Sequence, residues 1–387
     1  PRGARLMSRL LRATPPERLM ALWESLGVAL RVEAEGRVFP ASQQSATVVD
    51  ALLSALQRGG VEWRTHSEVH TVAPAPDGTF RLVDRHGAPV ADAHFDHVAV
   101  TCGGLARPEA LAPWEALGHA VEAPCPSLFG LRLDAPALAA LSGVSVNEVC
   151  LSLRDTKIRA RGPLLLTRQG VSGPGVLRLS AFGARVLAAA GHRGTLLIGW
   201  CGTADPERTL EELRCLFAAH GGRQVGSVRA FDLPARLWNV LLERAEVPAE
   251  RRCAELNRRQ LRQLAAVLTA DAYAVTGRTT HQGEFVTCGG VSLKSVSPKT
   301  MESRHVPGLF FAGEVLDIDG LTGGFNLTAA WLTGLTAGEG TARRAGEKAR
   351  GPPHPTFCPI WHAKTPTKPN LWRAKPASLV FYAYIRC

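Results

Sequence analysis

The segment over residues 306–338 combines the residue types that can hold an anionic or electron-rich ligand. A buried apolar strand leads to Gly313, and a carboxylate, Glu314, follows at once. Gly323 and Gly324 then allow the backbone to approach a ligand closely, just before a helix whose first turn has unpaired N–H groups and a partial positive charge. Such a helix start binds an anion or a carbonyl oxygen, and a nearby carboxylate suits hydroxyl groups. A strand, turn and helix without any ligand fits the same pattern equally well.

Other side chains that could take part in chemistry have simpler explanations. Cys102 and Cys288 each stand in a Thr-Cys-Gly-Gly run and could form a redox pair, although small buried residues beside glycines are favoured. His281 could face a cofactor as an acid, but a loop histidine without a role is favoured. Asp317 and Asp319 could act together, or they could cap turns. No Ser/His/Asp set and no metal-ligating group stands out, so the catalytic residues stay unknown and no metal is predicted.

Composition and charge narrow the class of protein. The 387 residues are 45% hydrophobic and 20% charged, which is typical of a folded globular protein. The net charge is +11, but residues 341–387 hold nine basic residues and one acid, which leaves +3 for residues 1–340. A basic surface for nucleic acid spread over the fold is therefore not implied, and we consider nucleic acid an unlikely partner. No apolar run reaches about 18 residues, so no membrane span is predicted. Nine scattered cysteines are typical of thiols in a reducing compartment.

The elements expected around these residues begin with an α/β arrangement. Apolar residues recur at helical spacing over residues 46–57, and residues 61–72 are predicted to form a strand. Asp77-Gly78 predicts a hairpin turn. Residues 97–101 then form a buried strand that ends in glycines. This order is typical of a doubly wound domain, although it also fits unrelated α/β folds.

The pattern changes from about residue 124, which predicts an inserted domain over residues 124–286. Short apolar segments make its first part β-rich, and residues 206–270 show helical periodicity. The α/β pattern resumes afterwards. We therefore predict a discontinuous α/β domain over residues 1–123 and 287–347, in which the first βαβ unit is missing. Residues 348–387 are basic and rich in proline, and a disordered tail is expected there.

Five ordered stretches carry a resemblance to a known family. They read GRVFP at 36–40, GPLLLT with GVSGP at 162–174, VT with GGVSLK at 286–294, PKTMES at 298–303, and GEVLDIDG with TGGFNL at 313–327. Together they resemble the BaiN/RdsA-type NAD(P)/FAD-dependent oxidoreductases, also labelled aminoacetone oxidase-like flavoproteins. The resemblance covers roughly residues 15–340. It implies a Rossmann-like FAD-binding domain with an inserted β-barrel and helical domain.

The resemblance also implies which residues hold FAD. It places Gly313, Glu314 and the residues from Gly323 to Leu327 along the flavin and ribityl chain, and Val69 against the adenine through its backbone. No G-x-G-x-x-G occurs before Arg37, so the loop that holds the diphosphate is expected upstream of Pro1, in an N-terminally truncated chain. The implied cofactor-binding residues are Arg37, Val69, Thr101, Gly103, Gly313, Glu314, Asp319, Gly323, Gly324, Phe325, Asn326 and Leu327.

The function implied is that of an FAD-dependent oxidoreductase. A hydride would move between the flavin and a small organic substrate, with NAD(P)H as the expected electron partner. The alternative is a cofactor-free remnant or binding protein without catalysis, which the missing glycine-rich loop supports. The family is mostly bacterial, so a cytoplasmic location is the default expectation, and the oligomeric state is left open.

Overall fold

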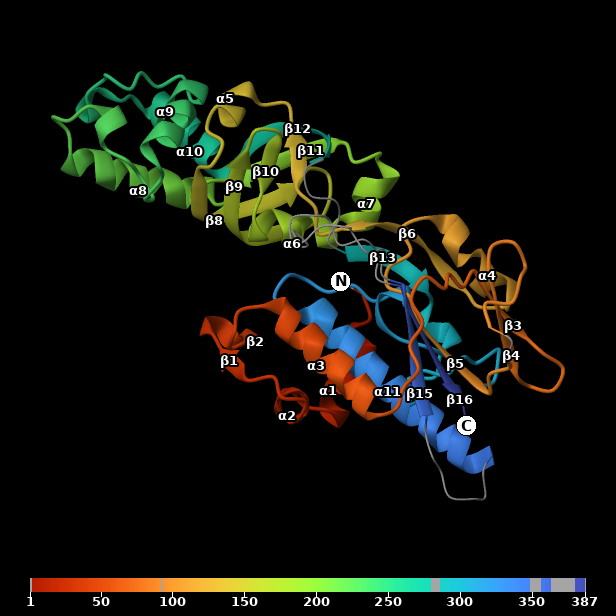
Figure 1. The fold of residues 1–387 in the computed structure, drawn as a ribbon. Coiled ribbons are helices and arrows are strands. Elements are labelled where there is room, and N and C mark those ends of the chain that lie inside the picture. Colours follow the sequence, from red (N-terminus) through yellow and green to blue (C-terminus); the bar gives the residue numbers. More distant parts are fainter. Residues whose placement is uncertain (1, 92, 280–285, 349–355, 363–379, 387) are drawn as a thin grey trace. The chain divides into compact units, whose positions relative to one another are not determined.

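The structure is a computed structural model that describes residues 2–91, 93–279, 286–348, 356–362 and 380–386. The chain divides into two compact units (Figure 1). Unit 1 comprises Pro1–Cys125 and Val286–Cys387, and unit 2 comprises Pro126–Phe285. Unit 2 is therefore inserted into the sequence of unit 1, and each unit has its own hydrophobic core.

Two buried parallel strands form the centre of unit 1. β5 (His97–Thr101) pairs with β14 (Leu309–Phe311), so that Val98 faces Leu309 and Val100 faces Phe311. All side chains of β14 and all but the last of β5 are buried, as expected for parallel strands that are covered on both faces. The prediction of a Rossmann-like α/β domain is confirmed, and both strands end where the predicted glycine turns begin.

Two described segments after residue 348 form strands, whereas the disordered tail expected over residues 348–387 stays a prediction for the rest of that range. β15 (Thr356–His362) and β16 (Val380–Arg386) extend the sheet in the order β14-β5-β16-β15. β16 runs antiparallel to β5, and β15 runs antiparallel to β16. The two segments are rich in β-branched and aromatic residues, which favour strands despite the high proline content around them.

Five α-helices surround the strands in the described part of unit 1. The N-terminal helix α1 contributes buried leucines to the main core and packs against the long helix α11. A second, small core forms around Trp23, whose ring centroid lies 4.8 Å from that of Trp331. The helices are α1 (Ala4–Ala13), α2 (Pro16–Ser25), α3 (Ser45–Arg58), α4 (Ala112–Ala116) and α11 (Phe325–Lys348).

The described residues of unit 1 also form three two-stranded sheets. They are β1 (Leu30–Val32) with β2 (Val38–Pro40), β3 (Thr71–Pro74) with β4 (Phe80–Val83), and β6 (Val121–Ser127) with β13 (Val286–Val291). The prediction of a strand over residues 61–72 is wrong in extent, because the strand begins only at Thr71. Residues 62–68 are mostly polar and gain no strand partner. The predicted turn at Asp77-Gly78 is confirmed, since the Thr79 N–H donates to Asp77 Oδ1 at 2.9 Å.

Unit 2 contains a closed barrel of six strands, which confirms the predicted inserted barrel. Side chains of its strand β9 alternate between exposed and buried, so every second residue fills the barrel. The strands follow the order β10-β7-β12-β11-β8-β9. They are β7 (Leu131–Leu133), β8 (Ser145–Leu153), β9 (Arg159–Thr167), β10 (Gly170–Ser172), β11 (Gly194–Gly199) and β12 (Asp271–Arg278).

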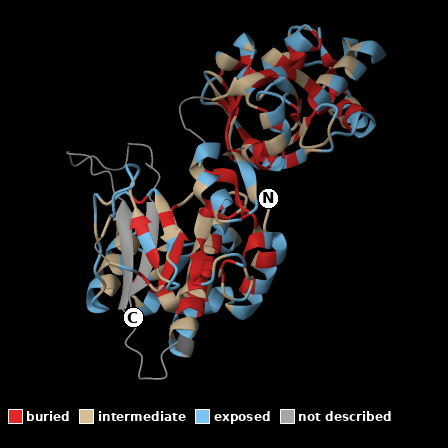
Figure 2. Ribbon diagram, turned by 90° about the vertical axis from the view of Figure 1, so that its right-hand side faces the viewer, coloured by how far each residue is buried: buried red, intermediate tan, exposed pale blue. Residues whose placement is uncertain are grey.

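Helices cover the barrel and extend unit 2 (Figure 2). Local signals explain where the longer helices begin: Asp205 caps α8 through two backbone N–H groups, and Asn257 with Gln260 forms a capping box at the start of α10. The helices are α5 (Pro136–Ala139), α6 (Pro174–Phe182), α7 (Ala184–Ala189), α8 (Pro206–Ala219), α9 (Ala235–Arg244) and α10 (Arg258–Ala270). Within the described ranges, no helix has the length and apolarity to cross a bilayer.

Candidate functional site

Three segments of unit 1 meet beside the end of β5. The backbone N–H of Thr287 donates to Glu314 Oε1 at 2.6 Å, so β13 fixes the carboxylate that follows β14. A Cβ atom on Gly104 would lie 2.6 Å from Thr287 Oγ1 and 2.7 Å from Glu314 Oε1. Only glycine fits this close approach. The second glycine of the Thr-Cys-Gly-Gly run after β5 is therefore required by packing.

The end of β14 is fixed to the middle of α11. The Ala312 N–H donates to Val100 O at 3.0 Å, which continues the pairing with β5. Gly313 follows with φ of +77°, a conformation that favours glycine, and its N–H donates to Thr333 Oγ1 at 2.9 Å. Because Thr333 is buried in α11, this bond sets the distance between the strand end and the helix.

The start of α11 is open. Gly323 and Gly324 have φ of +113° and +86°, and both are exposed. Phe325 and Leu327 are 60% and 59% exposed, although they are large apolar residues. The side chain of Asn326 braces the preceding loop, since its Oδ1 accepts from the Gly320 N–H at 2.7 Å and its Nδ2 donates to Gly320 O at 3.1 Å. The helix start thus combines glycine backbone, exposed apolar surface and first-turn N–H groups.

The carboxylate of Asp319 is buried and paired. Arg2 Nη1 donates to its Oδ1 at 2.7 Å, and the Arg2 backbone N–H donates to Asp319 O at 2.9 Å. Burial alone would lower the pKa of Arg2, but the hydrogen bond and charge of Asp319 raise that pKa above its ordinary value. The guanidinium therefore stays charged. Asp319 ties the loop between β14 and α11 to the N-terminal residues.

The structure places the predicted site residues in two groups. Thr101 ends β5, and Gly103 follows with φ of +75°, so both lie beside the segments that hold Gly313 and Glu314. Arg37 and Val69 form the second group. Arg37 is exposed before β2, and Val69 is buried in the core before β3. Among the described residues, no hydrogen bond or ion pair joins either of them to the group around Glu314.

The cysteines near the site pair differently from the sequence hypothesis. Cys102 is buried, and burial raises the pKa of its thiol to about 12. The thiol of Cys288 contacts Cys125 of β6 instead of Cys102, and this hydrogen bond together with burial raises the pKa of Cys288. Nothing in the sequence indicated that Cys125 and Cys288 lie side by side, because they are far apart along the chain. His281 lies outside the described residues.

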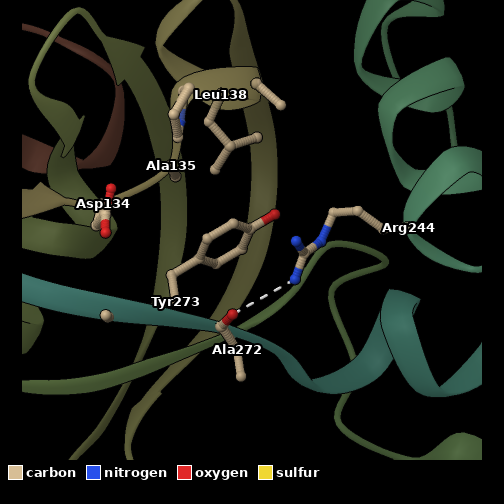
Figure 3. A pocket seen from close by; sticks show the side chains of 9 residues that line it. Asp134, Ala135, Leu138, Arg244, Ala272 and Tyr273 are labelled. Atoms are coloured by element: carbon tan, nitrogen blue, oxygen red, sulfur yellow. Dashed lines mark hydrogen bonds between the residues drawn. The ribbon is translucent and has the colours of Figure 1, made fainter.

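Unit 2 contains a small pocket, whose lining residues are drawn in Figure 3, and a polar network adjoins it through Arg244 and Tyr273. The pocket has a volume of about 190 Å³ and is lined by residues that include Asp134, Arg244 and Tyr273. Ligand pockets usually have about 300–1,000 Å³, so this one is too small for a dinucleotide. Asp271 beneath it accepts from Arg244 Nε at 2.9 Å, from Trp200 Nε1 at 3.0 Å and from Tyr273 Oη at 2.5 Å.

This network holds the barrel to α9. Burial and the charge of Asp271 raise the pKa of Tyr273, so its hydroxyl proton stays in the bond to the carboxylate. The Arg244 guanidinium also lies 4.6 Å above the Tyr273 ring. Sequence reasoning missed this set because its members come from α9, β12 and the residue that follows β11. The one available signal was an aspartate at the start of a strand whose next four residues are apolar or aromatic.

Comparisons with known proteins agree with this architecture. The family model described as the HI0933-like protein Rossmann domain matches residues 1–340. A ribosomal RNA dihydrouridine synthase of Escherichia coli is 31% identical over 315 residues, which cover 79% of this chain and 74% of that protein. A 3-dehydro-bile acid delta(4,6)-reductase of Clostridium scindens is 27% identical over 339 residues, 84% of this chain and 80% of that protein.

A further relative is a ribosomal RNA dihydrouridine synthase of Haemophilus influenzae, 27% identical over 321 residues, which cover 79% of this chain and 74% of that protein. The two RNA-directed names bear on the expectation that nucleic acid is an unlikely partner, and they weaken it. The Rossmann-like sheet, the inserted barrel and the family match lead to one assignment. The chain belongs to the HI0933-like Rossmann-domain family of FAD-binding flavin oxidoreductases.

Proposed function

We propose that the protein is an FAD-dependent reductase that saturates a conjugated carbon–carbon double bond, with NAD(P)H as the electron source. The names of the relatives support this reaction class. One relative is named for making dihydrouridine in ribosomal RNA, and another for reducing the delta(4,6) system of a bile acid. Both names describe the addition of two hydrogens to unsaturated carbons. The shared chemistry is the delivery of a hydride and a proton, whereas the substrates differ completely.

The open start of α11 is the observation that carries the proposal. A flavin is flat and apolar with a polar edge, and the exposed Phe325 and Leu327 beside exposed glycines suit such a ring. A Cβ on Gly324 would meet nothing within 4 Å, so this backbone faces open space and a ligand can approach it. The described residues therefore fit the flavin end of FAD.

The chain's own residues then have distinct tasks. FAD, when bound, supplies hydride transfer. The first-turn N–H groups of α11 would stabilise negative charge at the polar edge of the ring. Glu314, held by the Thr287 N–H, would accept hydrogen bonds from ribityl hydroxyls. Asn326 and the pair of Arg2 with Asp319 would hold the loop in position. No described residue is assigned as the proton donor.

The test begins with the absorption spectrum of the purified protein after incubation with FAD and desalting. We expect a retained flavin spectrum, bleaching by NADH or NADPH without oxygen, and reoxidation by either a steroid dienone or a uridine-containing RNA. Gly324→Val should abolish flavin retention. Gly78→Val is the matched control, because Gly78 has a similar φ of +79° and equally open space but lies in the β3–β4 turn.

The alternative of a cofactor-free binding protein predicts the opposite result. A folded protein that retains no flavin at any FAD concentration would contradict the proposal and support that alternative. Equal loss of flavin in the Gly324→Val and Gly78→Val variants would show that backbone strain, not the helix start, controls retention.

A further inference from the structure

Basic residues are concentrated in one part of unit 2. From Cys150 to Ala204 the sequence has eight Lys or Arg residues and a single acidic residue, Asp155. The other residues of 1–340 comprise 28 basic and 32 acidic ones. The net charge of +3 over residues 1–340 therefore conceals a segment of +7 within a background of −4.

The barrel brings these residues together at the turn between β8 and β9. The Arg154 N–H donates to Thr195 O at 3.0 Å, so Arg154 lies next to the turn that carries Arg193. Arg159 opposes Ser152 across the β8–β9 hairpin, which places it beside the same turn. Three arginines that are separated in the sequence thus share one end of the barrel.

The junction of α6 and α7 lies against the same turn. α6 packs on β8 and β9 (Figure 1), and a Cβ on Gly183 would lie 3.0 Å from Leu153 Cδ1. Arg178 Nη1 donates to Arg161 O at 3.4 Å, so α6 adds a further cation to this surface. Phe182, one helical turn after Arg178, is 45% exposed. An exposed aromatic ring therefore stands among arginines.

Asp155 lies in the same turn, but no described carboxylate forms an ion pair with the outer members of this set. The side chains of Arg154, Lys157, Arg159 and Arg193 are exposed, and none of them forms an ion pair or hydrogen bond with the part of the chain that the structure describes. Like charges at one surface repel each other and create a positive potential. A polyanion relieves this repulsion and gains from releasing its own counterions.

We propose that this surface binds single-stranded RNA, and we define the basic face as Arg154, Lys157, Arg159, Arg178, Phe182 and Arg193. Guanidinium groups bind phosphate through paired hydrogen bonds, which suits a face where arginine predominates. An exposed ring allows an unpaired base to stack. An acidic protein would use the charge but not the ring. The choice of RNA among polyanions rests on the proposed function, in which an RNA base is one substrate. The binding of RNA to the basic face does not require bound flavin.

Fluorescence anisotropy of the full chain with a short labelled single-stranded oligoribonucleotide, over a range of salt concentrations, tests this proposal. The triple variant Arg154→Gln, Arg159→Gln, Arg193→Gln should lower affinity at least about tenfold at low salt and reduce the salt slope by about 2. Phe182→Ala should lower affinity about fivefold or more without changing that slope.

The matched control removes the same charge elsewhere in unit 2. Arg258→Gln, Arg259→Gln, Arg262→Gln changes three exposed arginines of α10 and should leave affinity nearly unchanged. Equal losses in both triple variants, or stronger binding to phosphatidylglycerol vesicles than to RNA, would overturn the proposal. Circular dichroism shows whether each variant is folded. If the triple variant unfolds, Phe182→Ala, which keeps every charge, becomes the test, and unchanged RNA affinity in this variant contradicts the proposal. Failure here leaves flavin retention and bleaching intact, so it is distinguishable from failure of the proposed function.

Discussion

The pair of Arg2 and Asp319 allows a sharp test of how the proposed flavin site is built. Their side chains lie 2.7 Å apart, and Asp319 has no exposed surface whereas Arg2 is 23% exposed. If Asp319 acts by holding the loop between β14 and α11, both Arg2→Met and Asp319→Asn loosen that loop. If Asp319 instead contacts FAD directly, only its own substitution weakens FAD binding.

The magnitudes follow from burial. Removing one partner of a buried ion pair costs about 3–5 kcal/mol. Arg2→Met leaves a fully buried carboxylate without its cation, and because water reaches Arg2 we expect the lower end, about 3 kcal/mol of unfolding free energy. Asp319→Asn leaves an arginine that can be hydrated, so we expect about 1–2 kcal/mol. The double variant should be less unstable than the sum of the two, with a coupling of about 1–2 kcal/mol.

The assays are urea unfolding followed by circular dichroism, and FAD titration followed by flavin fluorescence. We expect the two single variants to lower FAD affinity to a similar degree, and the double variant to bind FAD no more weakly than either single variant. If Arg2→Met binds FAD with unchanged affinity while Asp319→Asn does not bind FAD at all, the positioning role of Asp319 is refuted. Strictly additive unfolding free energies would show that the pair is not coupled at all.

Three other outcomes follow from the structure. Gly104→Ala forces a methyl group into two close contacts, so it should lower the free energy of unfolding by at least about 1–3 kcal/mol and weaken FAD binding. Gly334→Ala is the control in α11, where the added methyl group meets open space, and it should raise the free energy of unfolding by about 0.5–1 kcal/mol in the same urea titration. The pKa of the Cys102 thiol is raised from 9.0 to about 12 in the folded protein, so its contribution to stability is complete below pH 9 and is lost as the pH rises toward 12. The urea midpoint should therefore fall between pH 9 and pH 12. Cys102→Ala should reduce this pH dependence. Asp271→Asn should lower the unfolding free energy of unit 2 by about 3 kcal/mol or more and leave flavin retention unchanged, and an unchanged urea midpoint would contradict the role given to the network.

The sequence predicts the elements that carry strong local signals. β5 and β14 were recognised because continuous β-branched and aromatic runs end in glycine. α11 was recognised from helical spacing after Gly323 and Gly324, and the barrel from short apolar segments together with the family motifs. Residues 61–72 were misjudged because alternation over a polar stretch does not guarantee a strand partner. The strands after residue 348 were missed because proline content outweighed two short β-forming runs.

Contacts between distant residues could not be predicted. Glu314 was identified as a site residue, but its bond to the Thr287 N–H and the exclusion of a side chain at Gly104 depend on three segments meeting in space. Asp319 was expected on a cofactor, and its pairing with Arg2 appears only when the N-terminal residues fold back on the loop. Asp271 was not noticed, because a charged residue in a barrel strand has no meaning until its partners are known.

The spatial distribution of charge could not be predicted from the net charge either. Net charge over residues 1–340 is a sum, and a sum near zero argues against a nucleic-acid partner only if the charges are mixed in space. Here the arginines that follow Cys150 lie on a single barrel and its helices, whereas the acidic excess lies elsewhere in the chain. A polyanion responds to the local potential within about one Debye length, about 8 Å at physiological salt, and not to the total. The near-neutral sum is therefore compatible with a strongly basic face, and net charge alone does not decide whether nucleic acid is a partner.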